Sequence, residues 1–250
     1  MITLNTIIYE KNFREILSKD SWVFNFKSKL ITRRSLTINN ISSKKELLER
    51  TEEMKKLFDF DLIWVEENSE QVKEKFNLQI DPNTVGYYYT IPYLVMIDNI
   101  KTDYVLNVAS DCMKDIHVDD NFLVDSLEEL ESNPLCSSTM VSWVKNNRTM
   151  ENGKTVGQHE YDELVKLGGI ENPEKFTYTT GFTDQFFLTR IDKLKINNYN
   201  LDSIYSESYQ GPSYGGNCFE KRIVGIQTYT GTYNCVYKGS DYYIHDKRYY

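Results

Sequence analysis

One short stretch in the middle of the chain constrains its fold more than any other. Tyr104–Val108 is a run of apolar and β-branched residues, which is typical of a strand buried on both faces. Residues 90–100 predict a helix that leads directly into this strand, and Asp111 follows the strand with a polar segment behind it. Open α/β sheets bind ligands at the carboxyl ends of their strands. The sequence therefore predicts a binding site at Asp111.

The first hundred residues alternate between strand and helix patterns. Strands are expected at residues 2–8, 35–39 and 62–65, and helices at 10–18, 43–58 and 68–76. Ser43 and Glu46 have the spacing of a capping box, which would open the long charged helix that ends near Phe58. This alternation predicts an α/β fold with a mostly parallel sheet flanked by helices.

The second half of the chain is less regular. It predicts a helix at residues 121–132, a strand at 137–144, helices at 160–167 and 219–226, and a tyrosine-rich tail from residue 228. Neither a repeat nor a low-complexity linker separates it from the first half. We therefore expect one domain over residues 1–250, with halves of different character at 1–120 and 121–250.

Composition excludes several classes of protein. The net charge of −8 argues against a nucleic-acid-binding protein that works by neutralising phosphates. No apolar run approaches the roughly 20 residues that cross a bilayer, and the amino terminus has no basic segment or cleavage site of a signal peptide. Cys112, Cys136, Cys218 and Cys235 lie far apart without C-x-x-C spacing. This pattern predicts a cytoplasmic protein with reduced thiols and no structural zinc.

The segment around Asp111 resembles the donor site of nucleotide-sugar glycosyltransferases with the Rossmann-like GT-A fold, in particular family-2-like members. The resemblance rests on the helix, the Thr102-Asp-Tyr sequence, the apolar strand and Asp111. In that family an Asp-x-Asp motif holds a divalent metal against the donor diphosphate. Here the motif reads Ala109-Ser110-Asp111, with one acidic residue replaced. The resemblance implies Mn²⁺ or Mg²⁺ with Asp111 as a ligand. Asp115, His117, Asp119 and Asp120 could form an alternative metal cluster, or simply a solvated loop.

Two further acidic residues resemble the acceptor side of this family. Asp184 follows Gly181-Phe-Thr and precedes an apolar run, and Glu220 follows the Gly215-Gly216 pair at the start of a predicted helix. In inverting members such a carboxylate is the general base for the acceptor hydroxyl. The resemblance implies that Asp184 is the base and that Glu220 is the second candidate. Alternatively, Asp184 caps a turn, and Glu220 is a first-turn carboxylate that suits the helix dipole.

The resemblance also implies a donor-binding set at both ends of the chain. The ends of the first two strands would contact the nucleotide through Asn5, Thr6, Asn39 and Asn40, and the tail would supply His245 to the metal and Lys247 and Arg248 to the diphosphate. The tail could act as a lid over the donor, or as a permanent strand packed on the core.

The resemblance implies an enzyme that moves a sugar from a nucleotide-sugar donor to a hydroxyl of a glycan or another acceptor, with inversion. Residues 1–120 would bind the nucleotide sugar and residues 121–250 the acceptor. An inactive GT-A-like domain that binds glycan or nucleotide sugar is the alternative that the incomplete Asp-x-Asp motif favours. A nucleotidyltransferase is disfavoured, because the amino-terminal region has no glycine-rich basic phosphate loop.

Overall fold

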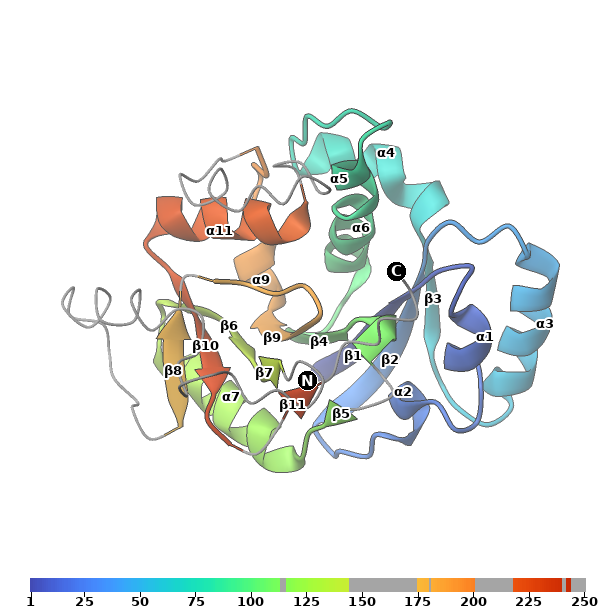
Figure 1. Cartoon of the computed structure of the whole chain (residues 1–250), viewed down its shortest axis with the longest axis horizontal. Coiled ribbons are helices and arrows are strands. Elements are labelled where there is room, and N and C mark those ends of the chain that lie inside the picture. The colour runs from blue at the N-terminus through green and yellow to red at the C-terminus, as the bar shows by residue number, and fades with distance from the viewer. Residues whose placement is uncertain (113–115, 144–174, 180, 201–217, 240–241, 244–250) are drawn as a thin grey trace.

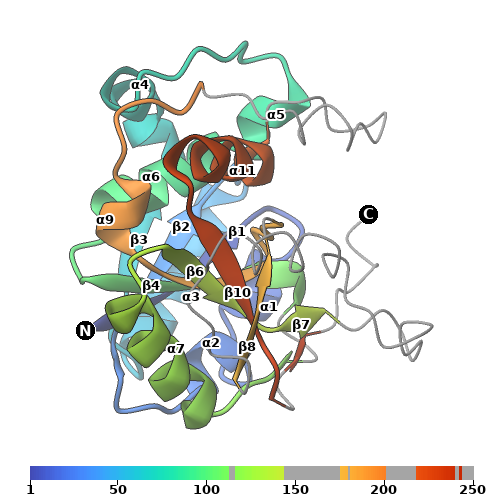
Figure 2. The same ribbon diagram turned by 90° about the vertical axis from the view of Figure 1, so that its left-hand side faces the viewer.

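The computed structural model describes residues 1–112, 116–143, 175–179, 181–200, 218–239 and 242–243. Its main feature is an eight-stranded sheet in the order β3-β2-β1-β4-β9-β6-β10-β8 (Figures 1 and 2). The strands of this sheet are β1 (Ile2–Ile8), β2 (Ile31–Ile38), β3 (Asp61–Trp64), β4 (Tyr104–Val108), β6 (Cys136–Met140), β8 (Phe176–Thr179), β9 (Phe186–Arg190) and β10 (Tyr233–Tyr237). Strands β5 (Ile116–His117), β11 (Tyr242–Tyr243) and β7 (Ser142–Trp143) form a second, three-stranded sheet.

Strand directions show that the large sheet is mostly parallel. Strands β3, β2, β1 and β4 pair in parallel, β9 runs antiparallel to both β4 and β6, and β10 is parallel to β6 and antiparallel to β8. Only β8 and β9 therefore oppose the others in this sheet. Both halves of the chain contribute strands to it, and β4 lies near its centre, which confirms the predicted mostly parallel α/β sheet.

Helices cover both faces of the sheet, with a separate apolar core on each face (Figure 1). One core includes residues of α1 (Phe13–Ile16), α2 (Trp22–Asn25), α3 (Lys44–Lys55) and α7 (Asp120–Ser132). The other includes residues of α4 (Val65–Lys75), α6 (Ile91–Asn99), α9 (Ile191–Leu194) and α11 (Phe219–Thr230), and the short α5 (Val85–Tyr88) precedes α6. Within β4, Leu106 faces the first core and Val105 the second. This alternation explains why an uninterrupted apolar run forms the strand.

The predicted strand bounds agree best with the structure where the apolar pattern is strongest. Strands β1 and β4 have the predicted bounds, whereas the strand expected at residues 137–144 is divided between β6 and β7. Strands β8 and β9 had no prediction, because each is short and polar residues surround it. The helix predicted at residues 160–167 lies outside the described residues.

The predicted capping box at α3 is wrong. The Ser43 side chain makes no cap hydrogen bond to the helix and instead donates to Glu10 Oε1 at 2.6 Å. The backbone N–H groups of Ser42 and Ser43 also donate to the Glu10 carboxylate, at 2.8 and 3.0 Å. These hydrogen bonds hold the pKa of Glu10 low, at about 2. A carboxylate from the loop after β1 thus replaces the local partner that the sequence pattern suggested.

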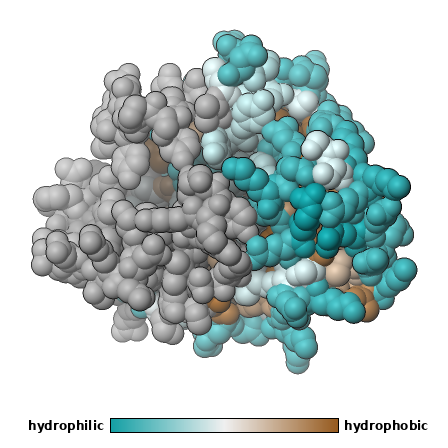
Figure 3. Space-filling model, turned by 45° about the vertical axis from the view of Figure 1, so that its right-hand side comes forward, coloured by the Kyte–Doolittle hydropathy of each residue, from teal (hydrophilic) through white to brown (hydrophobic). Residues whose placement is uncertain are grey.

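The outer surface near α3 and α4 is polar. The described part of the face in Figure 3 is mainly hydrophilic, with small apolar areas between the polar ones. Exposed Leu48 and Leu57 lie on and just after α3. Among the described helices, none has both the length and the apolar character needed to span a bilayer.

The central position of β4 leads to a stability prediction. Leu106→Ala should lower the free energy of unfolding by about 2–5 kcal/mol, because it removes a fully buried side chain and leaves a cavity. Urea unfolding followed by circular dichroism measures this change. The control is Leu48→Ala, at a position where the side chain is 48% exposed, which should change stability by no more than about 0.5 kcal/mol. Equal effects of the two substitutions would contradict the placement of β4.

Candidate active site

The candidate active site lies at the carboxyl end of β4. Because β9 runs antiparallel to β4, the start of β9 meets the end of β4, with Val108 opposite Phe186. The N–H group of Ala109 donates to the Gln185 carbonyl at 2.6 Å, which extends this pairing by one step. Asp111 lies just beyond, in a short 3₁₀ turn, and Asp184 lies just before β9. The sheet thus brings two predicted site residues from distant parts of the sequence to one edge.

Helix α11 brings Glu220 to the same place. The Asp184 N–H group donates to Glu220 Oε1 at 3.0 Å, and the two carboxyl groups also hydrogen-bond each other. Phe219 fixes the start of α11, since its ring stacks on Tyr93 with centroids 4.5 Å apart and an interplanar angle of 4°. The neighbouring Phe182 ring meets Phe219 edge-on. Aromatic packing therefore sets the position of Glu220.

The three carboxyl groups give the site a negative potential. Burial raises the pKa of Asp184 well above its usual range, and the nearby Glu220 and Asp111 carboxyl groups raise it further. Burial and the charge of Asp184 likewise raise the pKa values of Tyr9 and Tyr93, so both phenols stay protonated at neutral pH. Carboxyl groups whose pKa is raised by burial and by a neighbouring carboxyl group are typical of proton-transfer sites.

Two buried asparagine side chains form a chain of hydrogen bonds that connects this site to β1 and β2. Asn5 on β1 donates from Nδ2 to Asn107 Oδ1 on β4 at 2.9 Å, and Asn107 donates to the Asp184 carbonyl at 3.0 Å. Asn5 Oδ1 accepts from the hydroxyl groups of Ser35 and Thr37 on β2. The Asn5 side chain is fully buried, and both its nitrogen and its oxygen form hydrogen bonds within the protein. Asn5 therefore lies inside the sheet and away from a ligand surface.

The remaining donor-side candidates lie at the ends of β1 and β2. Thr6 and Asn39 are both buried. Thr6 Oγ1 has no hydrogen-bond partner among the described residues, whereas the Asn39 side chain hydrogen-bonds the Tyr9 hydroxyl group. Asn40 is exposed and has a φ of 52°, a left-handed conformation that asparagine tolerates. Asn39 and Asn40 directly follow β2, at the carboxyl edge of the sheet, where open α/β sheets bind ligands.

Asp111 has the chemistry of a metal ligand. Its side chain is half-buried, and Oδ1 accepts a weak hydrogen bond from the Cys112 thiol at 3.6 Å. Carboxylate oxygens are the ligands that Mg²⁺ and Mn²⁺ prefer, and the negative potential at this edge favours a cation. In the alternative acidic cluster, Asp119 caps α7 by accepting from the N–H groups of Asn121 and Phe122. That role explains Asp119 without a metal.

The tail candidates His245, Lys247 and Arg248 lie outside the described residues, as does the Gly215-Gly216 pair. Of residues 242–250, the structure describes Tyr242–Tyr243, which form the middle strand of the small sheet and pair with β5 and β7.

Several residues of this site had no place in the sequence prediction. Tyr9 and Tyr93 border Asp184 electrostatically, and Asn12 joins the loop after β1 to the end of β4 by donating to Ser110 Oγ at 2.5 Å. Asn107 could have been singled out from the sequence, because it is the one amide side chain in an otherwise apolar strand. No sequence pattern distinguished Tyr9, Asn12 or Tyr93, since such residues are common in loops and on helices.

Comparisons with known proteins give similarity to solved structures only: neither a protein-family model nor a curated protein matches. The chain is similar to S. aureus TarS in complex with UDP-GlcNAc, with 11% identity, a TM-score of 0.49, and coverage of 99% of this chain and 58% of that one. It is also similar to glucosyl-3-phosphoglycerate synthase from Mycobacterium tuberculosis in complex with Mn²⁺, UDP-glucose and phosphoglyceric acid. That match has 8% identity, a TM-score of 0.42, and coverage of 77% of this chain and 57% of the synthase.

Both matching proteins are GT-A glycosyltransferases, the group that the sequence resembles. This chain spans 58% of the matched TarS chain, which holds TarS residues 1–349, 36% of a longer TarS chain, and 57% of the synthase; the identities and TM-scores are low, so these matches carry no conclusion about activity. The strand order and helix layers described above are what define the fold as a mostly parallel α/β sheet flanked by helices.

Proposed function

We propose that this chain is a glycosyltransferase that moves a sugar from a nucleotide-sugar donor to a hydroxyl of a glycan or another acceptor. The observation that carries the proposal is the meeting of Asp184 and Glu220 beside Asp111 at the carboxyl edge of the central strand. Three carboxyl groups from distant segments give this edge both a proton acceptor and a ligand for a cation.

The donor would bind along the edge formed by β1, β2 and β4. Asn39 and the exposed Asn40, at the end of β2, would bond to the nucleoside, with the buried Thr6 on the neighbouring strand β1 beside them. Asn5 would act as a positioning residue through Asn107 instead of touching the nucleotide. Lys247 and Arg248 are proposed contacts of the diphosphate.

A divalent ion, Mn²⁺ or Mg²⁺, would be held by Asp111, with His245 as the proposed second protein ligand. When bound, such an ion neutralises charge that develops on a diphosphate leaving group. Ala109 occupies the position of the other acidic residue of the Asp-x-Asp motif, so Asp111 is the one carboxylate that the motif retains.

Asp184 would act as the general base. The acceptor oxygen attacks the anomeric carbon as its proton passes to Asp184, and the bond from that carbon to the diphosphate oxygen breaks on the opposite side. The products are an inverted glycoside and a nucleoside diphosphate. Glu220 would hold Asp184 in place through their shared hydrogen bond and keep its pKa raised.

The two halves of the chain would divide the substrates, with residues 1–120 binding the nucleotide sugar and 121–250 the acceptor. A cytoplasmic location and the absence of a nucleic-acid partner stay predictions. Replacement of the first acidic residue by Ala109 is the observation that favours the second candidate function, an inactive GT-A-like domain that binds nucleotide sugar or glycan without turnover.

A binding panel tests the proposal directly. The melting temperature is measured with UDP-, GDP-, CMP- and dTDP-sugars, each with and without Mn²⁺, and any stabilising donor is then assayed for hydrolysis and transfer. We expect one nucleotide class to raise the melting temperature and to be turned over. Binding without turnover supports the inactive domain. No binding by any donor contradicts the glycosyltransferase, and it also contradicts an inactive domain that binds nucleotide sugar.

Asp111→Asn should reduce donor turnover well beyond tenfold while the fold stays intact. The substitution removes a hard anionic oxygen ligand but keeps the size of the side chain. Transfer rates at saturating metal, together with circular dichroism of the variant, measure the two parts of this expectation. Wild-type activity in the variant would remove Asp111 from the mechanism.

Asp184→Asn should lower kcat by roughly 10²–10⁴-fold with donor affinity preserved, because it removes the proton acceptor. Glu220→Gln serves as the comparison and should have a smaller effect on kcat. Steady-state kinetics with varied donor and acceptor separate kcat from affinity. A larger kcat loss in Glu220→Gln, with donor affinity preserved, would reverse the assignment.

Asp184→Asn should also change how stability depends on pH. The pKa of Asp184 is raised in the folded protein relative to its unfolded value of about 3.9, so ionising this group costs folding free energy. The stability that its protonated form contributes is present below that unfolded value and is lost as pH rises through the folded pKa. The variant cannot lose a proton there.

The melting temperature of Asp184→Asn should therefore exceed that of the wild type at pH 8 by more than at pH 4. Asp59→Asn, at an exposed position, is the control and should show no such trend. An equal difference at both pH values would contradict the buried environment of Asp184.

A further inference from the structure

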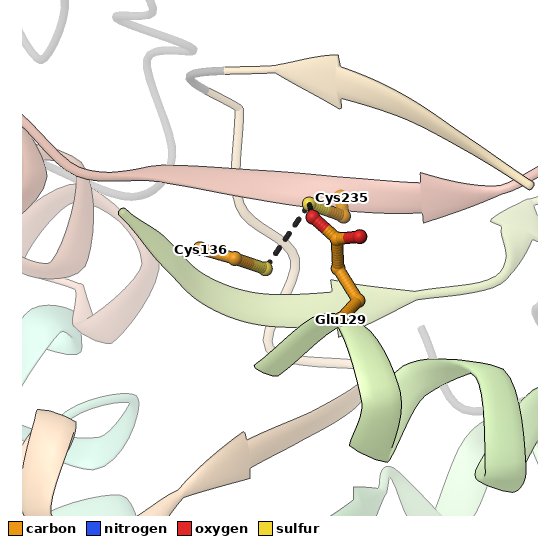
Figure 4. Close-up of side chains that lie close together, drawn as sticks. All are labelled: Glu129, Cys136 and Cys235. Atoms are coloured by element: carbon orange, nitrogen blue, oxygen red, sulfur yellow. Dashed lines mark hydrogen bonds between the residues drawn. The ribbon is translucent and has the colours of Figure 1, made fainter. Parts of the chain in front are cut away.

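A second cluster of metal-binding side chains lies between α7 and the sheet. Glu129 of α7, Cys136 of β6 and Cys235 of β10 are all buried, and their ligand atoms lie within 4.8 Å of one another. Figure 4 shows the Glu129 carboxylate reaching from the helix toward the two sulfur atoms. The cysteines are 99 residues apart in the sequence. Their strands pair directly, which brings them together.

The Glu129 side chain is buried without a cationic partner among the described residues. The side chain is 4% exposed, and its hydrogen-bond donors are the Asn133 amide at 2.6 Å and the Cys235 thiol at 3.8 Å. None of the ion pairs between described residues includes Glu129. A buried carboxylate with one amide and one weak thiol donor is poorly compensated. A cation between this carboxylate and the sulfur atoms would remove that cost.

The spacing of the thiols suits a bridging metal better than a disulfide. Cys136 is in register with Tyr233, so Cys235 lies two residues farther along β10. Two residues along β10 correspond to about 6.6 Å, and a register shift between Tyr233 and Asn234 adds an extra residue on β6, so the two Cα atoms are offset along the strands as well as across them. Disulfides rarely span more than about 6.8 Å between Cα atoms. The sulfur atoms are 3.0 Å apart, and tetrahedral zinc would need them to open to about 3.8 Å.

Two buried hydroxyl groups beside the cluster support the same conclusion. Ser126 lies one helical turn before Glu129, and Thr139 is directly opposite Cys235 in the sheet. Both residues are fully buried, and neither Ser126 Oγ nor Thr139 Oγ1 has a hydrogen-bond partner in the part of the chain that the structure describes. Orphaned hydroxyls on the facing surfaces of α7 and β6 are suited to bind a metal directly or through a water molecule.

We propose that Glu129, Cys136 and Cys235 bind a thiophilic divalent cation, represented by zinc, which ties α7 to β6 and β10. Two thiolates and one carboxylate are a ligand set that zinc accepts, with a hydroxyl or water as the fourth ligand. Binding displaces one proton from each thiol to solvent. This site lies away from the carboxyl edge of β4, and it stands whether or not the chain is a glycosyltransferase.

Metal content tests the proposal. The full chain is produced in zinc-supplemented medium, purified without a polyhistidine tag, and analysed for bound metal by mass spectrometry. We expect one zinc per chain in the wild type and background levels in the Cys136→Ser/Cys235→Ser double variant. The matched control Cys218→Ser removes another buried cysteine outside the cluster and should keep its zinc.

Two further measurements keep the test decisive if the double variant fails to fold. Wild-type protein stripped of metal and loaded with Co²⁺ should show thiolate-to-cobalt charge-transfer absorption, and added Zn²⁺ should raise its melting temperature. Glu129→Gln, a substitution of similar size, should reduce that rise. The proposal is overturned if the wild type shows neither metal nor cobalt absorption, if the folded double variant keeps its zinc, or if intact mass shows a Cys136–Cys235 disulfide.

Discussion

The antiparallel pairing of β9 with β4 is the contact on which the rest of the structure depends. Strand β4 is buried on both faces and is flanked by β1 on one side and β9 on the other. Its pairing with β9 joins the strands of the first half to those of the second half. The same pairing brings the segment before β9 to the carboxyl end of β4, so the geometry of the sheet produces the candidate active site directly.

Burial of Asp184 at the carboxyl edge of β4 lowers the stability of the fold but raises the pKa of this carboxyl group. Asp184 sits where desolvation and two neighbouring carboxyl groups oppose its ionisation. The surrounding structure compensates with fixed contacts, since Tyr93 and Asn107 both donate to the Asp184 carbonyl and Phe219 packs on Tyr93. A raised pKa on a rigid backbone suits a group that must exchange protons. The stability lost there is the expected cost of such a site.

The cluster between α7 and strands β6 and β10 also combines burial with uncompensated polar groups. Cys136 and Cys235 behave as ordinary buried thiols, but they are in contact with each other and lie beside a buried carboxylate, Glu129, that is poorly compensated. A metal at this place would complete their bonding and join a helix to two strands. In that case the second half of the chain, which has the weaker strand patterns, would gain a cross-link that its apolar residues alone do not provide.

The sequence by itself determined the strongest elements and the positions of the acidic candidates. Strands β1 and β4 could be predicted because they are rich in apolar and β-branched residues, and that pattern depends only on local composition. Asp111 could be placed at a strand end for the same reason. Strand β9 could not, since its five residues gain their stability from pairing with β4 and β6. Local propensity is weak evidence where such pairing decides the structure.

Only the tertiary structure decided which of these residues meet. It joined Asp184 to Glu220 across 36 positions, and it committed Asn5 to a buried amide network in place of a ligand surface. Sequence spacing gave no sign of the Cys136–Cys235 pair and argued against zinc, because a C-x-x-C pattern detects only ligands that are close in the chain. Strand order sets these distances, and strand order results from the packing of the whole core.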